Sequence, residues 1–225
     1  CSKYINDFKT QPKAVGEGSN MNVIIAGNGQ LYNDVPVTVS LTKEIDPYDL
    51  AGWYTISAPF ATESINIVGD YTLFRYNEKT AVWENHKAHE YYGLDLGRGY
   101  LYANLQGNDL TLEGLANVDT YQTTLKCESE VDELKGNHLL GNPYTFDITG
   151  EHLAGSIAGG FYQMAGNGAW VASELTEEIA VGEGFLVQAN EEASFAINKT
   201  ATETRSADNG SLQINVANDV YSDVA

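Results

Sequence analysis

The sequence GWYTISAPF spans residues 52–60, and GNHLLGNPY at residues 136–144 repeats its pattern. Both begin with glycine, continue with a run that favours β-structure, and end with a small or polar residue, proline and an aromatic residue. Proline cannot donate to an interior strand ladder, so it is expected to end the first strand of each unit. We therefore predict an internal duplication, with one β-rich unit built on each of the two stretches.

Two further markers follow each stretch in the same order. An aromatic strand leads to a tryptophan, and a Gly-x-Gly segment then opens a closing strand. In the first unit these are residues 73–76, Trp83 and residues 97–99; in the second they are residues 160–164, Trp170 and residues 182–184. Glycine supplies the unusual φ values or the close backbone approach that a tight turn or bulge needs. The shared order of the markers predicts two related sets of short strands.

Regular short strands separated by turn signals are typical of an all-β sandwich or barrel. We predict a jelly-roll-like β-sandwich built from two pseudo-repeats, with no long amphipathic helix. Each repeat has about 80 residues, which is marginal for a domain on its own, so an extensive shared interface is expected. The predicted parts are a lead-in and β-rib prelude at residues 1–50, a first repeat at 51–126, a second repeat at 127–204, and a linker with one strand at 205–225.

The ends of the chain carry more local predictions. Residues 1–20 are polar and are expected to form an irregular lead-in, while residues 21–41 read as strand, turn and strand. Residues 211–216 alternate apolar and polar side chains, which predicts a strand. That strand either joins the preceding sheet or begins a further module.

Composition excludes several partners. Among 225 residues, 12 are Lys or Arg and 31 are Asp or Glu, for a formal charge of -19. A nucleic-acid site needs a basic patch, and an anionic membrane surface attracts basic segments, so neither partner is expected. No run of about 18 apolar residues occurs, so no membrane-spanning segment is predicted.

The chain has two cysteines, Cys1 and Cys127, which are too few for a disulfide framework. Three interpretations of Cys1 stay open. It is a lipidated anchor of a secreted bacterial protein, a disulfide partner of Cys127, or the boundary of a processed or trimmed chain, and we favour the last.

Four motifs give residues 22–220 a resemblance to modules in large secreted or cell-surface proteins of Bacteroidetes, the group that uses type IX secretion. They are GWYxIxxP at residues 52–59, WxNxK at 83–87, GxGYLYAN at 97–104 and GNPY at 141–144. The prelude, with GQL at residues 29–31, resembles the β-rib that often precedes such modules. The resemblance implies an extracellular or outer-surface location and a non-catalytic role, and it supplies no catalytic residues and no ligand.

Few residues suggest metal or catalytic chemistry. His86 and His89 lack the spacing of the known zinc motifs and are expected on a solvated loop. No Gly-x-Ser-x-Gly elbow is present and neither cysteine has a recognisable partner, so we expect no enzyme and no cofactor. Calcium is the better metal alternative, because oxygen ligands gather in acidic loops at residues 44–49, 117–119 and 208–209. Solvated loops are favoured over calcium sites at all three places.

Aromatic residues make the one positive case for a binding site. Trp83, Asn85, Tyr91 and Tyr92 lie close together in the sequence of the first unit. Flat aromatic faces can stack on sugar rings while amides bind hydroxyl groups, so these four residues are the candidate ligand-binding site. The alternative, which we favour, is that the aromatic residues form the sandwich core. Exposure of Trp83, Tyr91 and Tyr92 in one patch would distinguish the two.

These observations predict a non-catalytic structural or adhesion module of a larger extracellular protein. The alternative is a carbohydrate-binding module that uses the exposed aromatic residues of the first repeat. The expected partners are other modules of the parent protein, host or plant glycans, or a host surface protein.

Overall fold

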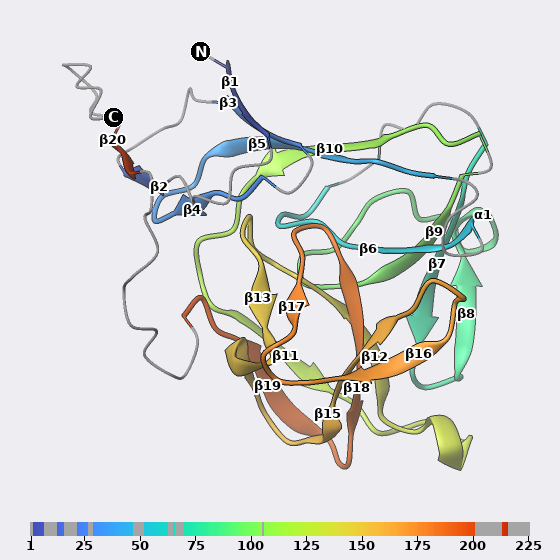
Figure 1. Cartoon of the computed structure of the whole chain (residues 1–225). Helices are drawn as coiled ribbons and strands as arrows, with labels where there is room; N and C mark the ends of the chain where they lie inside the picture. The colour runs from blue at the N-terminus through green and yellow to red at the C-terminus, as the bar shows by residue number, and fades with distance from the viewer. Residues whose placement is uncertain are drawn as a thin grey trace.

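The computed structural model describes residues 2–6, 13–15, 22–26, 29–46, 52–62, 65, 70–104, 106–200 and 213–215. Nearly all regular structure in these residues is β, so the all-β prediction is confirmed (Figure 1). None of the helices in these ranges is long and apolar enough to cross a membrane.

The first unit contains a four-stranded antiparallel sheet in the order β6-β9-β7-β8. Its strands are β6 (Tyr54–Ile56), β7 (Thr72–Asn77), β8 (Val82–Asn85) and β9 (Tyr100–Ala103). Proline and phenylalanine follow β6 at positions 59 and 60, as the repeat pattern predicts. The Gly-x-Gly segment at residues 97–99 leads directly into β9.

The second unit contains a sheet with the same strand order, β12-β18-β15-β16, and all its pairs are antiparallel. Its strands are β12 (Asn137–Gly141), β15 (Ile157–Met164), β16 (Trp170–Ser173) and β18 (Gly184–Ala189). In both sheets the first strand pairs with the last, and the middle two form a hairpin. The duplication itself stays a prediction, and the shared strand order is the structural observation that favours it.

A second sheet accompanies each of these two. In the first unit, β1 (Ser2–Asn6), β3 (Asn22–Ala26) and β5 (Thr38–Lys43) run parallel, and β10 (Leu110–Leu115) pairs antiparallel with β5. In the second unit, β11 (Tyr121–Leu125), β19 (Ala193–Ile197) and β14 (Leu153–Ala154) form an antiparallel sheet in that order. The smaller sheets pair β13 (Ile148–Thr149) with β17 (Glu178–Ile179), and β2 (Lys13–Val15) with β4 (Tyr32–Asn33) and β20 (Gln213–Asn215).

Two hydrophobic clusters form the cores of the two units. In β9, Tyr100 and Tyr102 are buried while Leu101 between them is half-buried, and in β18 Phe185 and Val187 are buried on either side of Leu186. A strand presents alternate side chains to opposite faces, so each strand contributes every second residue to the core. Large aromatic side chains therefore provide much of the buried apolar area in both units.

The two units meet through backbone groups at the Gly-x-Gly segments. The N–H of Gly141 donates to the carbonyl of Gly97 at 3.0 Å, and the N–H of Ser57 donates to the carbonyl of Gly182 at 2.9 Å. Ser57 and Gly141 hold the same place in the repeat pattern, so each unit makes an equivalent contact with the other. A Cβ added at Gly141 would lie 2.2 Å from the Cβ of Ser57, which explains why glycine stands there.

A buried carboxylate adds a second link between the units. Glu78, in the turn between β7 and β8, accepts hydrogen bonds from the backbone N–H groups of Glu128, Ser129 and Gly136, each at 3.0 Å. Burial opposes ionisation of Glu78, but these three N–H groups outweigh it and lower the pKa of the carboxyl group. The hairpin turn of the first unit is therefore fixed to the segment that leads into β12.

The prelude packs against the second unit. The N–H of Leu31 donates to the carbonyl of Thr145 at 2.7 Å, and the Thr145 hydroxyl donates back to the carbonyl of Leu31 at 2.5 Å. The rings of Tyr32 and Phe146 stack beside them at 4.0 Å. Residues far apart in the sequence thus form one continuous packing layer.

Two local predictions need correction, and one predicted strand can be placed. The lead-in at residues 1–20 contains β1 and β2 rather than only irregular chain, because both strands find parallel partners. Residues His86–His89 form the one-turn helix α1 instead of a loop, since the Asn85 side chain caps it by accepting from the N–H of Lys87. The predicted strand near the end of the chain is β20, and it pairs with β2.

Other predictions stay open. The domain boundaries at residues 50, 126 and 204 stay predictions, although β5 and β11 each pair with a strand that lies beyond one of these boundaries. Cys127 carries a free thiol whose sulfur donates to the carbonyl of Ala189 at 3.7 Å. Cys1 lies outside the described residues, so its lipidation stays a prediction.

Candidate functional site

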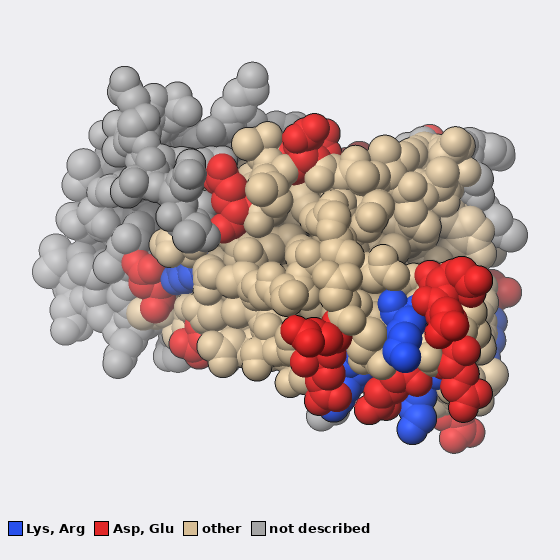
Figure 2. All heavy atoms as spheres, turned by 90° about the horizontal axis from the view of Figure 1, so that it is seen from below, with Lys and Arg blue, Asp and Glu red and all other residues tan. Residues whose placement is uncertain are grey.

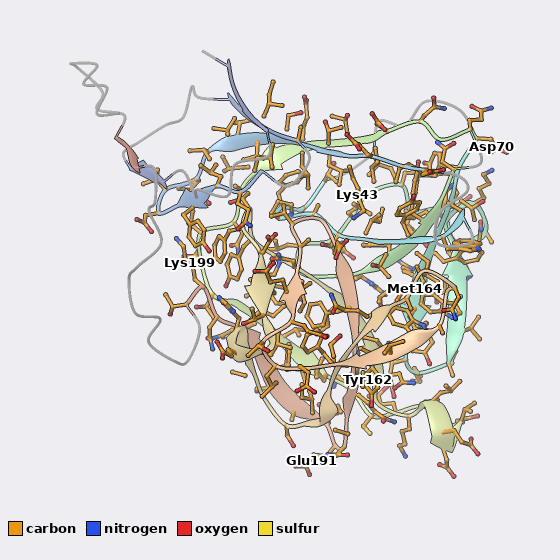
Figure 3. All side chains as sticks on the ribbon, in the orientation of Figure 1. Lys43, Asp70, Tyr162, Met164, Glu191 and Lys199 are labelled. Atoms are coloured by element: carbon orange, nitrogen blue, oxygen red, sulfur yellow. The ribbon has the colours of Figure 1, made fainter. Side chains whose placement is uncertain are left out.

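A small apolar pocket lies where the β7–β8 hairpin of the first unit meets the β15–β16 hairpin of the second. It encloses about 320 Å³, and its walls include all three tryptophans of the chain. The lining residues are Trp53, Phe74, Trp83, Leu101, Met164, Gly168 and Trp170. Met164, the last residue of β15, is labelled in Figure 3.

Strand alternation builds the wall from the first unit. Trp83 and Asn85 lie on one face of β8, opposite Tyr76 and Phe74 of β7 in the strand register, while Glu84 points to the other face. The rings of Trp83 and Tyr76 pack 5.1 Å apart at 60°. Trp53 completes this wall, with its ring 5.7 Å from that of Phe74.

A tight turn builds the opposite wall. Met164 and Trp170 are paired across the β15–β16 hairpin. Between them, the N–H of Ala165 donates to the carbonyl of Ala169 at 2.8 Å, and Gly168 adopts a φ of 80° that favours glycine. The tip of this hairpin thereby reaches Trp53 of the first unit.

The two hairpin tips make different contacts with the opposite unit. The tip that carries Glu78 binds the N–H of Gly136, at the start of the second repeat stretch. The tip that carries Gly168 approaches Trp53, at the start of the first repeat stretch, and no carboxylate lines that pocket. Hydrogen bonds therefore close the contact between the β7–β8 hairpin and the second unit, whereas the contact between the β15–β16 hairpin and the first unit contains a pocket.

The four residues predicted as a site are divided between two faces of the sheet. Trp83 lines the pocket, and Asn85 lies on the same face, where its side-chain oxygen accepts from the N–H of Lys87 at 2.9 Å. Tyr91 and Tyr92 lie beyond α1 and pack on the opposite face, against Arg75 and His86. The structure therefore does not bring Trp83, Tyr91 and Tyr92 into one patch.

The hydroxyl and one ring face of Tyr91 are already occupied. Its hydroxyl donates to the carbonyls of Glu84 at 2.7 Å and Leu73 at 3.2 Å, and the Arg75 guanidinium lies 4.4 Å from its ring centre. Burial raises the pKa of Tyr91 to about 12. Tyr92 is 49 % exposed, with its ring edge-on to the buried ring of His86.

Sequence reasoning named Trp83 as a candidate and did not name Trp53 or Trp170. It took the matching positions of Trp83 and Trp170 in the two units to favour a structural role for both. Both tryptophans, like Trp53, are only half-buried in the structure. Large aromatic side chains that are half-buried around a hollow are the usual lining of a small-ligand site.

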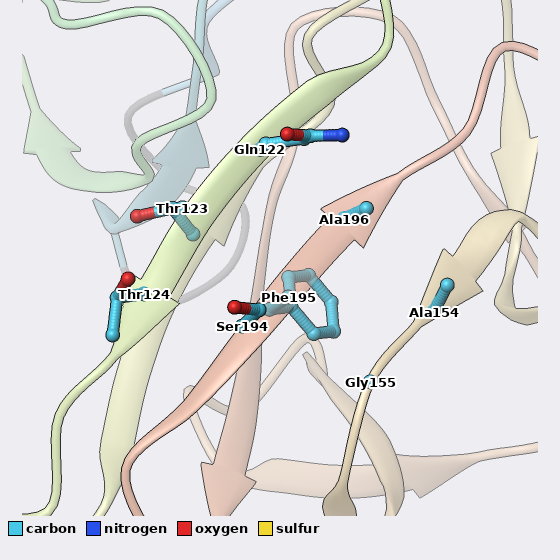
Figure 4. A pocket seen from close by; sticks show the side chains of 8 residues that line it. All are labelled: Gln122, Thr123, Thr124, Ala154, Gly155, Ser194, Phe195 and Ala196. Carbon is cyan, nitrogen blue, oxygen red and sulfur yellow. The ribbon is translucent and has the colours of Figure 1, made fainter.

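A second hollow is larger and polar. It encloses about 570 Å³ over the sheet of β11, β19 and β14 (Figure 4). Hydroxyl and amide side chains from Gln122, Thr123, Thr124 and Ser194 line it beside the small residues Ala154, Gly155 and Ala196. This polar groove has no aromatic side chain on its rim, since Phe195 is buried beneath it.

The two histidines that were compared with the zinc motifs are separated or occupied. His86 is buried and stacked on Tyr71, its Nδ1 accepts from the N–H of Leu73 at 3.1 Å, and burial lowers its pKa. His89 at the other end of α1 is exposed. Across the part of the chain that is described, no three His, Cys, Asp or Glu side chains gather as a metal site requires.

Two of the three acidic loops extend outside the described residues, at 47–49 and at 208–209. In the third, the Asn117 side chain is bonded to the backbone of Asp119 in both directions, at 2.8 and 3.2 Å.

Charge is distributed in clusters over the surface. On the face shown in Figure 2, acidic side chains gather in groups with a few basic ones between them, and an uncharged area covers the middle. The residues that line the apolar pocket carry no titratable group. The pocket can therefore hold a ligand by contact and stacking, and it offers no group for proton transfer.

A comparison of the chain with protein-family models, with curated proteins and with solved structures finds no match.

Proposed function

We propose that this chain is a non-catalytic adhesion module that binds a neutral sugar in the apolar pocket between its two units. The observation that carries the proposal is the meeting of Trp53, Trp83 and Trp170 around one hollow of about 320 Å³. That volume is at the small end of the range for ligand sites, which suits one or two sugar rings. Half-buried indole rings offer flat apolar faces to the C–H face of a pyranose, and their N–H groups remain donors for hydroxyl groups.

The charge of the chain favours a neutral sugar over an acidic one. The formal charge is -19, and the pocket walls contain no cation to offset it. A sialylated, sulfated or uronic-acid glycan would meet repulsion on its approach. Asn85, on the same face as Trp83, has a side-chain amide nitrogen that can donate to a hydroxyl at the rim.

A non-catalytic role is supported by the chemistry of the pocket. General acid–base catalysis needs a titratable side chain within hydrogen-bond reach of the ligand. Carboxylate, imidazole and hydroxyl side chains are all absent from the residues that line this pocket. The extracellular location and the place in a larger bacterial surface protein rest on the sequence motifs, and other modules of that protein remain proposed partners.

The test is binding of the purified chain to immobilised neutral and acidic oligosaccharides, followed by titration of tryptophan fluorescence. We expect binding to at least one neutral glycan, and a loss of affinity of at least about tenfold in Trp83→Ala and Trp170→Ala, as for anchoring aromatic residues in other interfaces. Tyr92→Ala is the matched control, because it removes an exposed aromatic ring outside the pocket. The thermal unfolding of each variant is measured alongside.

Two results would overturn the proposal. The first is the absence of binding across the neutral panel. The second is binding that is unchanged in both folded tryptophan variants but lost in Tyr92→Ala, which would place the site on the opposite face of the sheet.

A further inference from the structure

The two units differ at one edge of their accompanying sheets. In the first unit, β5 pairs antiparallel with β10 and, on its other side, parallel with β3. In the second unit, β11 has the place of β5, because it precedes the four-stranded sheet and pairs antiparallel with β19. β11 is the last strand of its sheet, and none of the strands described in the chain pairs with its outer side.

The backbone of β11 has groups that point to this outer side. In an antiparallel pair, residues alternate between those that bond to the partner strand and those whose N–H and C=O point away. The N–H of Asn198 donates to the carbonyl of His152 at 2.8 Å, so Asn198 and Ala196 bond to β14, and Phe195 and Ile197, which alternate with them, face β11. Their register partners Thr123 and Tyr121 therefore bond toward β19, and Gln122 and Thr124 are the outward set. Thr123 and Thr124 also line the polar groove, so solvent reaches this part of the strand (Figure 4).

The composition of β11 is unusual for an edge strand. It reads YQTTL, with no charged residue, no proline and no glycine, in a chain that has 31 acidic residues. Soluble proteins usually protect exposed edges with charges, prolines or bulges, since unpaired N–H and C=O groups attract other strands. Tyrosine and threonine favour extended structure, so this edge is both unprotected and ready to pair.

The first unit shows what kind of strand fits such an edge. Val23 and Ile25 of β3 are buried opposite Val39 and Leu41 of β5, while Ile24 between them is half-buried. A strand that pairs there contributes apolar β-branched side chains at every second position. It runs parallel to the strand it joins.

We propose that the outer edge of β11 accepts, in parallel, an extended segment of another polypeptide with β-branched apolar residues at alternate positions and an uncharged or basic flank. Main-chain hydrogen bonds to Gln122 and Thr124 would provide the pairing, as in other cases of strand addition. The charge of -19 favours such a partner over a second copy of this chain, which would carry the same excess of acidic residues. This proposal is independent of the sugar site.

The probe is a synthetic peptide with the sequence of residues 20–28, NMNVIIAGN, with one lysine added at each end. It carries the alternation that β3 presents to β5. We expect fluorescence anisotropy to show saturable binding to the intact chain, and hydrogen exchange to show slowed amides at Gln122 and Thr124. The matched control peptide contains the change Ile24→Pro, which removes a donor, and we expect it to bind at least about tenfold more weakly.

The protein variant for this test is Thr124→Pro. It removes an outward N–H and no bond to β19, so the fold is expected to tolerate it. It should weaken peptide binding at least about tenfold, whereas Gln122→Ala, which changes a side chain on the same strand and keeps its N–H, should leave binding unchanged. If Thr124→Pro fails to fold, the exchange data on the unaltered chain decide the question.

Three outcomes would overturn the proposal. They are no saturable binding, binding that protects amides elsewhere and not those of Gln122 and Thr124, and binding that Thr124→Pro leaves intact. Sedimentation of the chain alone is a further measurement. A dimer that Thr124→Pro abolishes would assign this edge to a second copy and overturn the stated partner.

Discussion

Gly141 donates its backbone N–H to the carbonyl of Gly97 at 3.0 Å, and this bond lies at the centre of the interface between the two units. A side chain at Gly141 would collide with the Cβ of Ser57 on the facing unit. The equivalent bond between Ser57 and Gly182 gives the interface a matching second half. The interface therefore depends on small residues at a few positions.

Replacement of Gly141 by alanine should destabilise the chain by about 2–4 kcal/mol, because overpacking at a rigid backbone contact cannot relax. The added Cβ would lie 2.2 Å from the Cβ of Ser57 and 2.7 Å from the carbonyl oxygen of Arg98. Urea unfolding measures the loss. Gly168→Ala is the control, because no atom lies within 4 Å of its added Cβ, and it should lose only the about 1–2 kcal/mol that a positive φ costs. Equal losses in the two variants would show that the contact at Gly141 is not tight.

Glu78→Gln should reduce the free energy of unfolding at pH 7 by about 1–3 kcal/mol, since three buried N–H groups lose a charged acceptor. The pKa of Glu78 is lowered in the folded chain, so its stabilising effect is present above the unfolded pKa and is lost as pH falls through the folded pKa. The difference between wild type and variant should therefore shrink as the pH falls below about 4. Glu128→Gln, at an exposed site, should change stability by less than about 0.5 kcal/mol. A difference that stays constant with pH would contradict this account.

Asp147 has the opposite pH dependence. Burial raises its pKa to about 6, although the N–H of Val181 donates to it and the side chain of Gln30 lies against its second oxygen. The folded chain holds this proton more tightly than the unfolded chain, so the contribution of Asp147 to stability falls as pH rises from about 4 to about 6. Relative to wild type, Asp147→Asn should gain on the order of 2 kcal/mol between pH 4 and pH 7. A carboxyl resonance that titrates near pH 4 in NMR would show that the environment of Asp147 is not apolar.

Tyr91→Phe should cost about 1–2 kcal/mol, because the carbonyls of Glu84 and Leu73 lose a buried donor. Tyr92→Phe is the control, since the ring of Tyr92 is exposed at the surface. Thermal unfolding followed by circular dichroism measures both variants. Both should bind neutral glycans as the wild type does, and a loss of glycan binding in the folded Tyr91→Phe variant would contradict the placement of the pocket.

The β-architecture could be predicted from sequence because proline, glycine and alternation act locally. Pro59 and Pro143 follow the first strands of the two four-stranded sheets, and residues 97–99 and 182–184 open the last ones, as their conformational preferences require. Helix α1 was missed because its one turn depends on a cap by the single residue Asn85. One capping residue is weak evidence for a helix in a sequence, although in the folded chain its hydrogen bond stabilises the turn.

The site was only partly predictable, for two physical reasons. Alternation along β8 places Trp83 and Glu84 on opposite faces, but the position of Tyr91 depends on how α1 reverses the chain. The approach of Met164 and Trp170 to Trp53 depends on how two units pack, which no local pattern encodes. Glu78 resembles any other surface carboxylate in the sequence, and only the fold shows that it is buried.

The packing of Leu31 on Thr145 has a consequence for the time course of folding. The two residues are 114 positions apart, so their bonds cannot form until the second unit has been synthesised. At typical translation rates of about 5–20 residues per second, the prelude waits about 6–20 s for its partner. Contacts of such high sequence separation also slow refolding of the complete chain, since a long loop must close before they contribute. The segment around Leu31 is thus made early and secured late, and it must remain free of aggregation during that interval.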